Sequence, residues 1–152
     1  MKKDDCIFCK IAAGEIPSRK IYEDSDLIAI MDLNPTSKGH SLIIPKEHCT
    51  NIYDIDEDIA AKVMKTAKKL ATKMTVALNC DGFNLLQNNG ETAGQTMFHF
   101  HMHLIPRYKD ADNNMLKFTS VSFSDEEMDA IRDQIINCLL YTSDAADDRI
   151  SV

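Results

Sequence analysis

The sequence predicts an α+β fold, a mainly antiparallel β-sheet with one long helix and short helices near the N- and C-termini. Three observations lead to this class. Apolar side chains alternate with histidines over residues 98–104, which is the period of a strand. Apolar side chains recur at helical spacing over residues 56–78. Shorter apolar segments between turn-forming residues supply further strands.

The composition indicates one globular domain. A chain of 152 residues can bury a sizeable core, and 44% apolar and 27% charged residues are ordinary fractions. The net charge of -7 argues against non-specific binding of nucleic acid. No apolar run approaches the roughly 18 residues of a membrane span, and the start lacks the apolar core of a secretion signal. We therefore expect a cytoplasmic protein with no membrane or nucleic-acid partner and with cysteines that are reduced or bind a metal.

A short helix is predicted over residues 5–13. Asp5 can cap it and Gly14 ends it. Its apolar stripe consists of Ile7, Phe8 and Ile11. Cys6 and Cys9 lie within this turn at the spacing of half a tetrahedral zinc site, a pattern that two reduced core cysteines also satisfy.

Three short strands follow in the prediction. Residues 21–23 and 27–31 form a pair around a turn, and residues 40–45 form a buried strand that a proline closes. His40 lies at the start of this third strand and His48 just after its end. Either histidine could be an ordinary loop residue.

The long helix is predicted over residues 56–78, with Asp56 as its N-cap. Its apolar face consists of Ile59, Val63, Ala67, Leu70, Ala71, Met74 and Leu78. The lysines lie mostly on other faces and indicate solvation rather than a nucleic-acid patch. Asp81 and Gly82 stop the helix, and residues 82–87 form the next strand.

The strongest functional signal is the segment 98–107, which holds three of the five histidines. Alternate residues of a strand share a face, so His99, His101 and His103 are expected together, with neighbours ~6–7 Å apart. A half-exposed strand with a histidine-rich polar face is the plain alternative. Imidazole is a recurrent ligand and acid–base group near neutral pH, so three on one face favour a functional site.

A loop of turn-forming residues, 88–96, directly precedes the histidines. Gly90 and Gly94 permit backbone conformations closed to other residues. The N–H groups of such a loop can form a nest for an anion, although a plain connection between strands would have the same composition.

Residues 99–105 resemble the signature of the histidine triad (HIT) family, His-φ-His-φ-His-φ-φ, where φ is apolar. Residues 6–11, 14–18, 39–46 and 93–96 also resemble bacterial members, in the same order. The resemblance extends from about Cys6 to Arg107. It implies the HIT-like fold, a nucleotide hydrolase or transferase that cleaves at the α-phosphate, and a homodimer.

The resemblance implies a covalent mechanism. Neutral imidazole can attack phosphorus, and His101 would form a nucleotidyl-histidine that water then hydrolyses. The His99 carbonyl would hold the Nδ1–H of His101, which leaves Nε2 as the nucleophile. His103 would hold phosphate oxygens, and His40 would support the histidines from behind.

The resemblance also implies a site for a purine nucleotide. Gln95 would hold phosphate oxygens together with Thr96, which stands where many members have Ser. Asn88 would face the phosphate or ribose, and Asp32 would accept both ribose hydroxyls. The base pocket would be lined by Ile7, Phe8, Ile11, Ile30 and Leu33. Each of these five apolar residues is also compatible with an ordinary place in the core.

A structural zinc ion is a further implication, with Cys6, Cys9, His48 and His99 as ligands. Two cysteines and two histidines make a closed tetrahedral set. His99 would then have to turn away from the face predicted for His101. The phosphoryl chemistry itself requires no metal.

We expect a nucleoside phosphoramidase or related nucleotidyl hydrolase, with a dinucleoside polyphosphate hydrolase as the alternative within enzymes of this type. A catalytic zinc ion on the three strand histidines is another possibility, but it leaves Asp32 and residues 94–96 without a role. A nucleotide-binding interaction protein with vestigial activity is the last, and the intact histidines, Gln95 and Thr96 argue against it.

A capping box at residues 124–127 predicts a last helix, with Met128, Ile131 and Ile135 as its apolar stripe. The composition changes abruptly at Cys138. Residues 138–147 resemble the in-frame translation of a transposase-based sequencing adapter. We therefore predict that residues 1–137 form the HIT-like domain and that residues 138–152 are a non-native tail without function. A genuine, unstructured C-terminus is the alternative.

Overall fold

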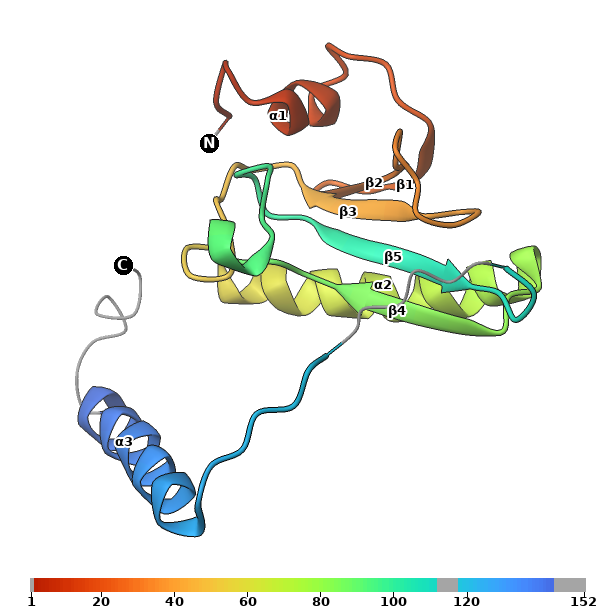
Figure 1. Ribbon diagram of the computed structural model, residues 1–152. Helices are drawn as coiled ribbons and strands as arrows, with labels where there is room; N and C mark the ends of the chain where they lie inside the picture. Colours follow the sequence, from red (N-terminus) through yellow and green to blue (C-terminus); the bar gives the residue numbers. More distant parts are fainter. Residues whose placement is uncertain (1, 112–117, 144–152) are drawn as a thin grey trace. The chain divides into compact units, whose positions relative to one another are not determined.

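The computed structural model describes residues 2–111 and 118–143, and the chain divides into two units, residues 1–114 and 115–152. The first unit contains α1 (Ile7–Ala12), β1 (Lys20–Glu23), β2 (Leu27–Met31), β3 (Ser41–Pro45), α2 (Glu57–Leu78), β4 (Gly82–Leu86), the 3-10 helix η1 (Glu91–Ala93) and β5 (Met102–Arg107) (Figure 1). The second contains α3 (Asp125–Ser143). Within the described ranges, no helix is both long and apolar enough to cross a membrane.

The strands form one sheet in the order β1-β2-β3-β5-β4, and each neighbouring pair is antiparallel. This arrangement confirms the predicted α+β class. The register of β3 against β5 places Leu42 opposite His103. Because His40 lies two residues before Leu42, the topology brings His40 and His103 close together although 63 residues separate them.

Helices α1 and α2 cover opposite faces of the sheet, as Figure 1 shows for the first unit. Strand β2 illustrates the consequence, because its first four residues are all buried. Leu27 and Ala29 belong to a core cluster with Val63, Ala67 and Leu70 of α2. Ile28 and Ile30 belong to a second cluster with Phe8 and Ile11 of α1. Burial on both faces explains why this strand is apolar throughout.

The helix ends follow their side-chain chemistry, with one difference from the prediction. Asp56 caps α2 as expected, and its carboxylate accepts hydrogen bonds from the N–H groups of Asp58 and Ile59. The helix ends at Leu78, as predicted, and its C-cap Asn79 has the left-handed conformation with φ of 52°. Helix α1 is capped by Cys6 rather than Asp5, because the Sγ atom of Cys6 accepts from the Cys9 N–H at 3.4 Å.

The predicted histidine strand is only partly a strand. β5 begins at Met102, and the preceding backbone makes a different contact, in which the Phe100 N–H donates to the Cys49 carbonyl at 2.7 Å. The His99 side chain is fully buried and its Nε2 lies 2.8 Å from the Pro45 carbonyl oxygen. The prediction that His99 shares a face with the next two histidines is therefore wrong, because its ring is held by groups outside β5.

Helix α3 begins with the predicted capping box. The Ser124 N–H donates to Glu127 Oε1 at 2.9 Å, and the Glu127 N–H donates to Ser124 Oγ at 3.1 Å. The predicted stripe residue Ile135 is 56% exposed. The helix runs to Ser143, past the boundary predicted after Asn137, whereas residues 144–152 of the predicted tail lie outside the described residues.

Candidate functional site

His40, His101 and His103 form one group, the histidine cluster. The His40 Nε2 atom lies 2.9 Å from His103 Nδ1, and the rings of His101 and His103 have centroids 5.0 Å apart. Asp32, at the end of β2, brings its Oδ2 atom to 3.5 Å from His40 Nε2. Three of the four predicted catalytic side chains, together with the predicted ribose ligand, thus lie together.

A hydrogen bond and a ring contact with Phe8 hold His101, in addition to its contact with the His103 ring. Its Nδ1–H donates to the His99 carbonyl at 2.7 Å, which is the bond implied by the family resemblance. The ring of Phe8 meets the His101 ring edge-on with centroids 5.1 Å apart. With Nδ1–H engaged, the remaining lone pair of a neutral His101 is on Nε2.

Burial keeps the histidine cluster uncharged. Burial lowers the pKa of His40 and of His101, and the Asp32 carboxylate opposes that shift only in part. Burial together with neighbouring His101 and His40 lowers the pKa of His103 to about 4. At neutral pH these imidazoles therefore offer lone pairs and N–H groups rather than positive charge.

A second group, the thiol–imidazole group, contains the predicted zinc ligands Cys6, Cys9, His48 and His99. Cys6 Sγ lies 3.3 Å from His99 Nδ1, and Cys9 Sγ lies 3.4 Å from His48 Nδ1. The four ligand atoms lie within 4.8 Å of one another. A tetrahedral zinc ion separates its N and S ligands by about 3.3–3.8 Å, given bonds of ~2.0–2.3 Å. Both quoted sulfur–nitrogen separations match this range, so the group could hold one zinc ion.

Two hydrogen bonds favour the protonation states of His99 and Cys9 that a bound cation requires. His99 Nε2–H donates to the Pro45 carbonyl, which leaves the Nδ1 lone pair directed at the thiols. Cys9 Sγ accepts from the Lys3 N–H at 3.3 Å, a contact that favours a thiolate. Burial nevertheless raises the pKa of the Cys9 thiol and lowers the pKa of His99 to about 4. A buried divalent cation would satisfy thiolates that burial alone disfavours.

Gln95 differs from its predicted role. Its side chain is buried, and the Nε2 atom donates to the carbonyls of Thr50 and Met97 at 2.7 and 3.1 Å. Its Oε1 atom accepts from the Gly90 N–H at 2.8 Å. In this structure Gln95 ties residues 90–97 to the segment after β3 instead of presenting its amide to a phosphate. The neighbouring Thr96 is exposed.

The other predicted nucleotide-binding residues are spread more widely. Asn88 is partly buried and lies beside Gly94, where an added Cβ atom would be 3.6 Å from Asn88 Nδ2. Ile11 and Ile30 pack in the core cluster under α1, as Phe8 does. Ile7 and Leu33 are exposed by 51% and 79%. Phe8 in addition makes a ring contact with His101 of the histidine cluster.

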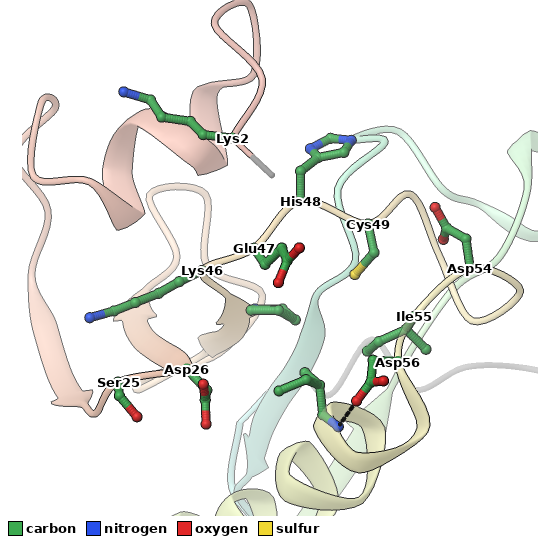
Figure 2. Close-up of a pocket in the computed structure, with 12 residues that line it drawn as sticks. Lys2, Ser25, Asp26, Lys46, Glu47, His48, Cys49, Asp54, Ile55 and Asp56 are labelled. Carbon is green, nitrogen blue, oxygen red and sulfur yellow. Dashed lines mark hydrogen bonds between the residues drawn. The ribbon is translucent and has the colours of Figure 1, made fainter.

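A cavity of about 640 Å³ lies beside the thiol–imidazole group rather than over the histidine cluster. Figure 2 shows His48 and Cys49 at this cavity, together with Lys46 and acidic residues such as Asp54. Its lining includes neither His101 nor His103.

Sequence reasoning missed the backbone groups that hold the side chains of His40 and Gln95. The Thr36 N–H donates to His40 Nδ1 at 3.0 Å, and the Thr50 carbonyl accepts from Gln95. Every residue except proline has a backbone N–H and every residue has a carbonyl, so no residue type marks these contacts in a sequence.

Residues 13–110 match the family described as HIT domain. The chain is 38% identical over 130 residues to adenosine 5'-monophosphoramidase hnt1 of Schizosaccharomyces pombe, covering 86% of this chain and 95% of that one. A crystal structure of a HIT family protein from Bacillus anthracis aligns with a TM-score of 0.83 at 42% identity, covering 89% and 97% of the two chains. A Zn-bound histidine triad family protein from Mycobacterium smegmatis aligns with a TM-score of 0.70 at 30% identity, covering 88% and 97%.

Proposed function

The chain belongs to the HIT family, and we propose that it hydrolyses purine nucleotide conjugates at the α-phosphate, with a nucleoside phosphoramidate as the preferred class. The observation that carries the proposal is the His101 Nδ1–H bond to the His99 carbonyl at 2.7 Å, in a ring that burial keeps neutral. This bond leaves Nε2 with an unshared electron pair for attack on phosphorus.

The proposed reaction has two displacements. His101 Nε2 forms a bond to the α-phosphorus while the bond from phosphorus to the leaving nitrogen breaks, and the leaving amine takes a proton from solvent. Water then forms a P–O bond as the P–Nε2 bond breaks, which releases a nucleoside monophosphate and a proton and regenerates neutral His101. Hydrogen-bond donors around the phosphate oxygens lower both barriers by stabilising the negative charge that accumulates there.

The remaining residues keep the roles that the resemblance implies, except for Gln95. His103 holds a phosphate oxygen, and Asp32 accepts ribose hydroxyls next to His40, from which it is 3.5 Å away. Thr96 is exposed and remains suited to a phosphate contact, together with Asn88. Gln95 holds the loop that carries Thr96, because its amide already bonds to protein groups.

Zinc is part of the proposal as a structural ion on Cys6, Cys9, His48 and His99. The compact donor set supports it, and a related structure from Mycobacterium smegmatis is described as Zn-bound. The ion would supply cross-linking between α1, the segment after β3 and the segment before β5. The chemistry at phosphorus is left to His101 and its neighbours.

Replacement of His101 tests the proposed function. His101→Ala and His101→Gly should reduce kcat by at least about 1,000-fold and leave nucleotide affinity within a few fold of wild type, since a nucleophile acts in the transition state. Retention of more than a few per cent of wild-type kcat by His101→Ala would overturn the assignment. Absence of turnover of any nucleotide conjugate by the wild-type protein would favour a nucleotide-binding interaction protein.

A comparison of substrates tests the preferred class. Adenosine 5'-phosphoramidate should have a higher kcat/KM than a dinucleoside tetraphosphate. The similarity to a relative named adenosine 5'-monophosphoramidase supports this order. A ratio in favour of the tetraphosphate would replace the phosphoramidase proposal with a dinucleoside polyphosphate hydrolase.

A further inference from the structure

Asp32, His40 and His103 form another possible metal-binding set. Their ligand atoms lie within 4.8 Å of one another, as those of the thiol–imidazole group do. Two histidines and a carboxylate are a common metal-binding set. The hydrogen bonds around His40, however, decide which ring nitrogens carry protons. They indicate a different role for this group.

The starting point is a backbone donor. The Thr36 N–H lies 3.0 Å from His40 Nδ1. A peptide N–H can only donate, so His40 Nδ1 must be the acceptor and carries no proton. In the neutral ring the proton is then on Nε2. Burial lowers the pKa of His40, which makes the neutral ring the relevant form near pH 7.

The same argument decides which nitrogen of His103 carries the proton. The Nε2–H of His40 points at His103 Nδ1, 2.9 Å away, so this second nitrogen is again an acceptor. A neutral His103 must therefore carry its proton on Nε2, at the ring edge away from His40. The Asp32 carboxylate is 3.5 Å from His40 Nε2 and favours the same placement of the proton.

We infer that the Thr36 backbone N–H, acting through His40, fixes His103 as the Nε2–H tautomer, so that His103 presents a hydrogen-bond donor to the substrate phosphate. This inference rests on the proposed function for the identity of the substrate, but the tautomers are a property of the free protein. Thr36 and His40 are positioning residues in this scheme.

The two neighbouring histidines, His101 and His103, therefore present opposite groups on Nε2. His101 donates Nδ1–H to the His99 carbonyl and so presents a lone pair on Nε2. His103 accepts at Nδ1 and so presents Nε2–H. One backbone carbonyl and one backbone N–H thus give opposite tautomers to two rings whose centroids are 5.0 Å apart. A lone pair at both positions would repel an anionic phosphate, whereas one donor stabilises it.

The same reasoning argues against a metal ion on Asp32, His40 and His103. A metal bound to His40 Nε2 would force the ring proton onto Nδ1, where it would face the Thr36 N–H. The thiol–imidazole group lacks this obstacle, because His99 Nε2–H bonds to a carbonyl and its Nδ1 is free for a metal. We therefore expect one zinc ion per chain rather than two.

Long-range ¹H–¹⁵N NMR of the imidazoles in the full, zinc-supplied protein tests the inference directly at pH 7. His40 and His103 should each show a protonated Nε2 and an unprotonated Nδ1, and His101 should show the reverse. A His103 that carries its proton on Nδ1, or that exchanges between both tautomers, would overturn the inference even if the protein hydrolyses nucleotides. Two zinc ions per chain, with one lost in His40→Ala, would also overturn it.

Variants test the chain of hydrogen bonds. Thr36→Pro removes the backbone N–H and Thr36→Ala retains it, so only the first should mix the tautomers of His40 and His103. If Thr36→Pro does not fold, two substitutions of His40 decide. His40→Ala should mix the tautomers of His103 and lower kcat about tenfold or more, and His40→Gln, whose amide N–H can reach the same atom, should recover part of both. Equal kcat and equal NMR spectra of His103 in the two His40 variants would contradict the relay.

Discussion

Gly39 connects the packing of α2 to the position of His40. It lies directly before His40 and has φ of 91°, a conformation that L residues rarely adopt. A Cβ atom at this position would lie 2.5 Å from Leu78 Cδ1, at the end of α2. The glycine therefore permits both the turn into β3 and the close approach of the last turn of α2.

Replacement of Gly39 should destabilise the protein more than an equivalent change elsewhere. Gly39→Ala combines left-handed strain with an overlap at the end of the flexible Leu78 side chain, which a rotamer change can relieve at modest cost, for a loss of roughly 2 kcal/mol in the free energy of unfolding. Gly14→Ala is the matched control, because Gly14 has φ of 80° and open space around its Cβ position. We expect that control to cost about 1 kcal/mol. Denaturant unfolding of both variants measures the difference, and equal losses would show that the contact with Leu78 is unimportant.

Single residues also show where sequence reasoning succeeds and where it ends. Asp56 was predicted as a cap from its type and position alone, and a local hydrogen bond is all that this role requires. The buried position of His99 depends on a carbonyl 54 residues away, and that of Gln95 on a carbonyl 45 residues away. Contacts of this kind arise from the tertiary fold, so the local alternation of residues 98–104 predicted a longer strand than the one that forms.

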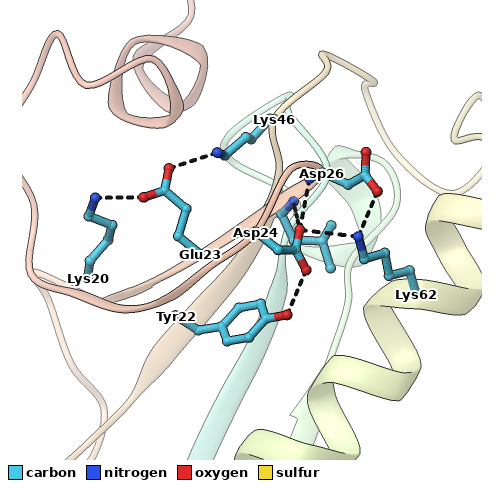
Figure 3. A network of polar contacts seen from close by, with 8 residues as sticks. Lys20, Tyr22, Glu23, Asp24, Asp26, Lys46 and Lys62 are labelled. Carbon is cyan, nitrogen blue, oxygen red and sulfur yellow. Dashed lines mark hydrogen bonds and ion pairs between the residues drawn. The ribbon is translucent and has the colours of Figure 1, made fainter.

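At the level of elements, the turn between β1 and β2 is joined to α2 by a polar network (Figure 3). The Asp24 carboxylate accepts hydrogen bonds from the Tyr22 hydroxyl at 2.6 Å and from the Leu27 N–H at 2.8 Å. Lys62 of α2 lies 3.3 Å from Asp24 and 2.6 Å from Asp26. Burial alone would raise the pKa of Asp24, but these hydrogen bonds and the lysine lower it well below its usual range.

The network predicts a pH-dependent contribution to stability. Because the folded-state pKa of Asp24 is depressed, its contribution is present above the unfolded-state pKa of about 3.9 and is lost as pH falls towards the folded-state value. Asp24→Asn should therefore lower the free energy of unfolding by about 1–3 kcal/mol at pH 7, and the difference from wild type should shrink below about pH 4. Urea unfolding between pH 2.5 and 7 measures this trend.

Asp26→Asn is the control for the same turn. Asp26 also contacts Lys62, but its side chain is 43% exposed and makes a surface ion pair. Such pairs contribute about 0–1 kcal/mol. An Asp24→Asn effect that is no larger than the Asp26→Asn effect, or that does not change with pH, would refute the role assigned to the Asp24 carboxylate.

Zinc removal tests whether the proposed ion stabilises α1. This helix has six residues and is too short to be stable alone. Cys6 caps it and Cys9 lies within it, so the proposed ion would attach α1 to the sheet. Loss of the ion should lower Tm more than it lowers kcat at a permissive temperature, because binding to the native state stabilises that state. Elemental analysis and thermal unfolding before and after chelation measure this. Less than a tenth of a zinc ion per chain, after purification with zinc supplied, would exclude the site.

At the level of the whole molecule, β4 lies at one edge of the sheet. An edge strand carries backbone groups that can pair with another chain, and Leu85 on β4 is 43% exposed. We propose that this edge contributes to a homodimer, so light scattering at micromolar concentration should give about twice 17.1 kDa. Leu85→Lys should shift the mass towards 17.1 kDa, whereas Val76→Lys on α2, at a position 82% exposed, should not. A 17.1 kDa wild-type species would contradict the dimer.

The last prediction concerns the segment from Cys138 onward. Every residue assigned to catalysis, nucleotide binding or zinc lies before residue 108, in the first unit of the chain. A protein that ends at Asn137 should therefore keep its kcat, its KM and one zinc ion per chain. Helix α3 continues through the proposed boundary to Ser143, so the deletion removes the last turns of a helix and should weaken that helix.

Two measurements separate these effects. Circular dichroism should report less helix in the deletion than in the full chain, while turnover of adenosine 5'-phosphoramidate should be unchanged within about twofold. A second deletion that ends at Phe123 removes all of α3 and is the reference for a protein without this helix. If the protein that ends at Asn137 loses turnover while the full chain retains it, residues 138–152 contribute to function, and the interpretation of this segment as a non-native tail is wrong.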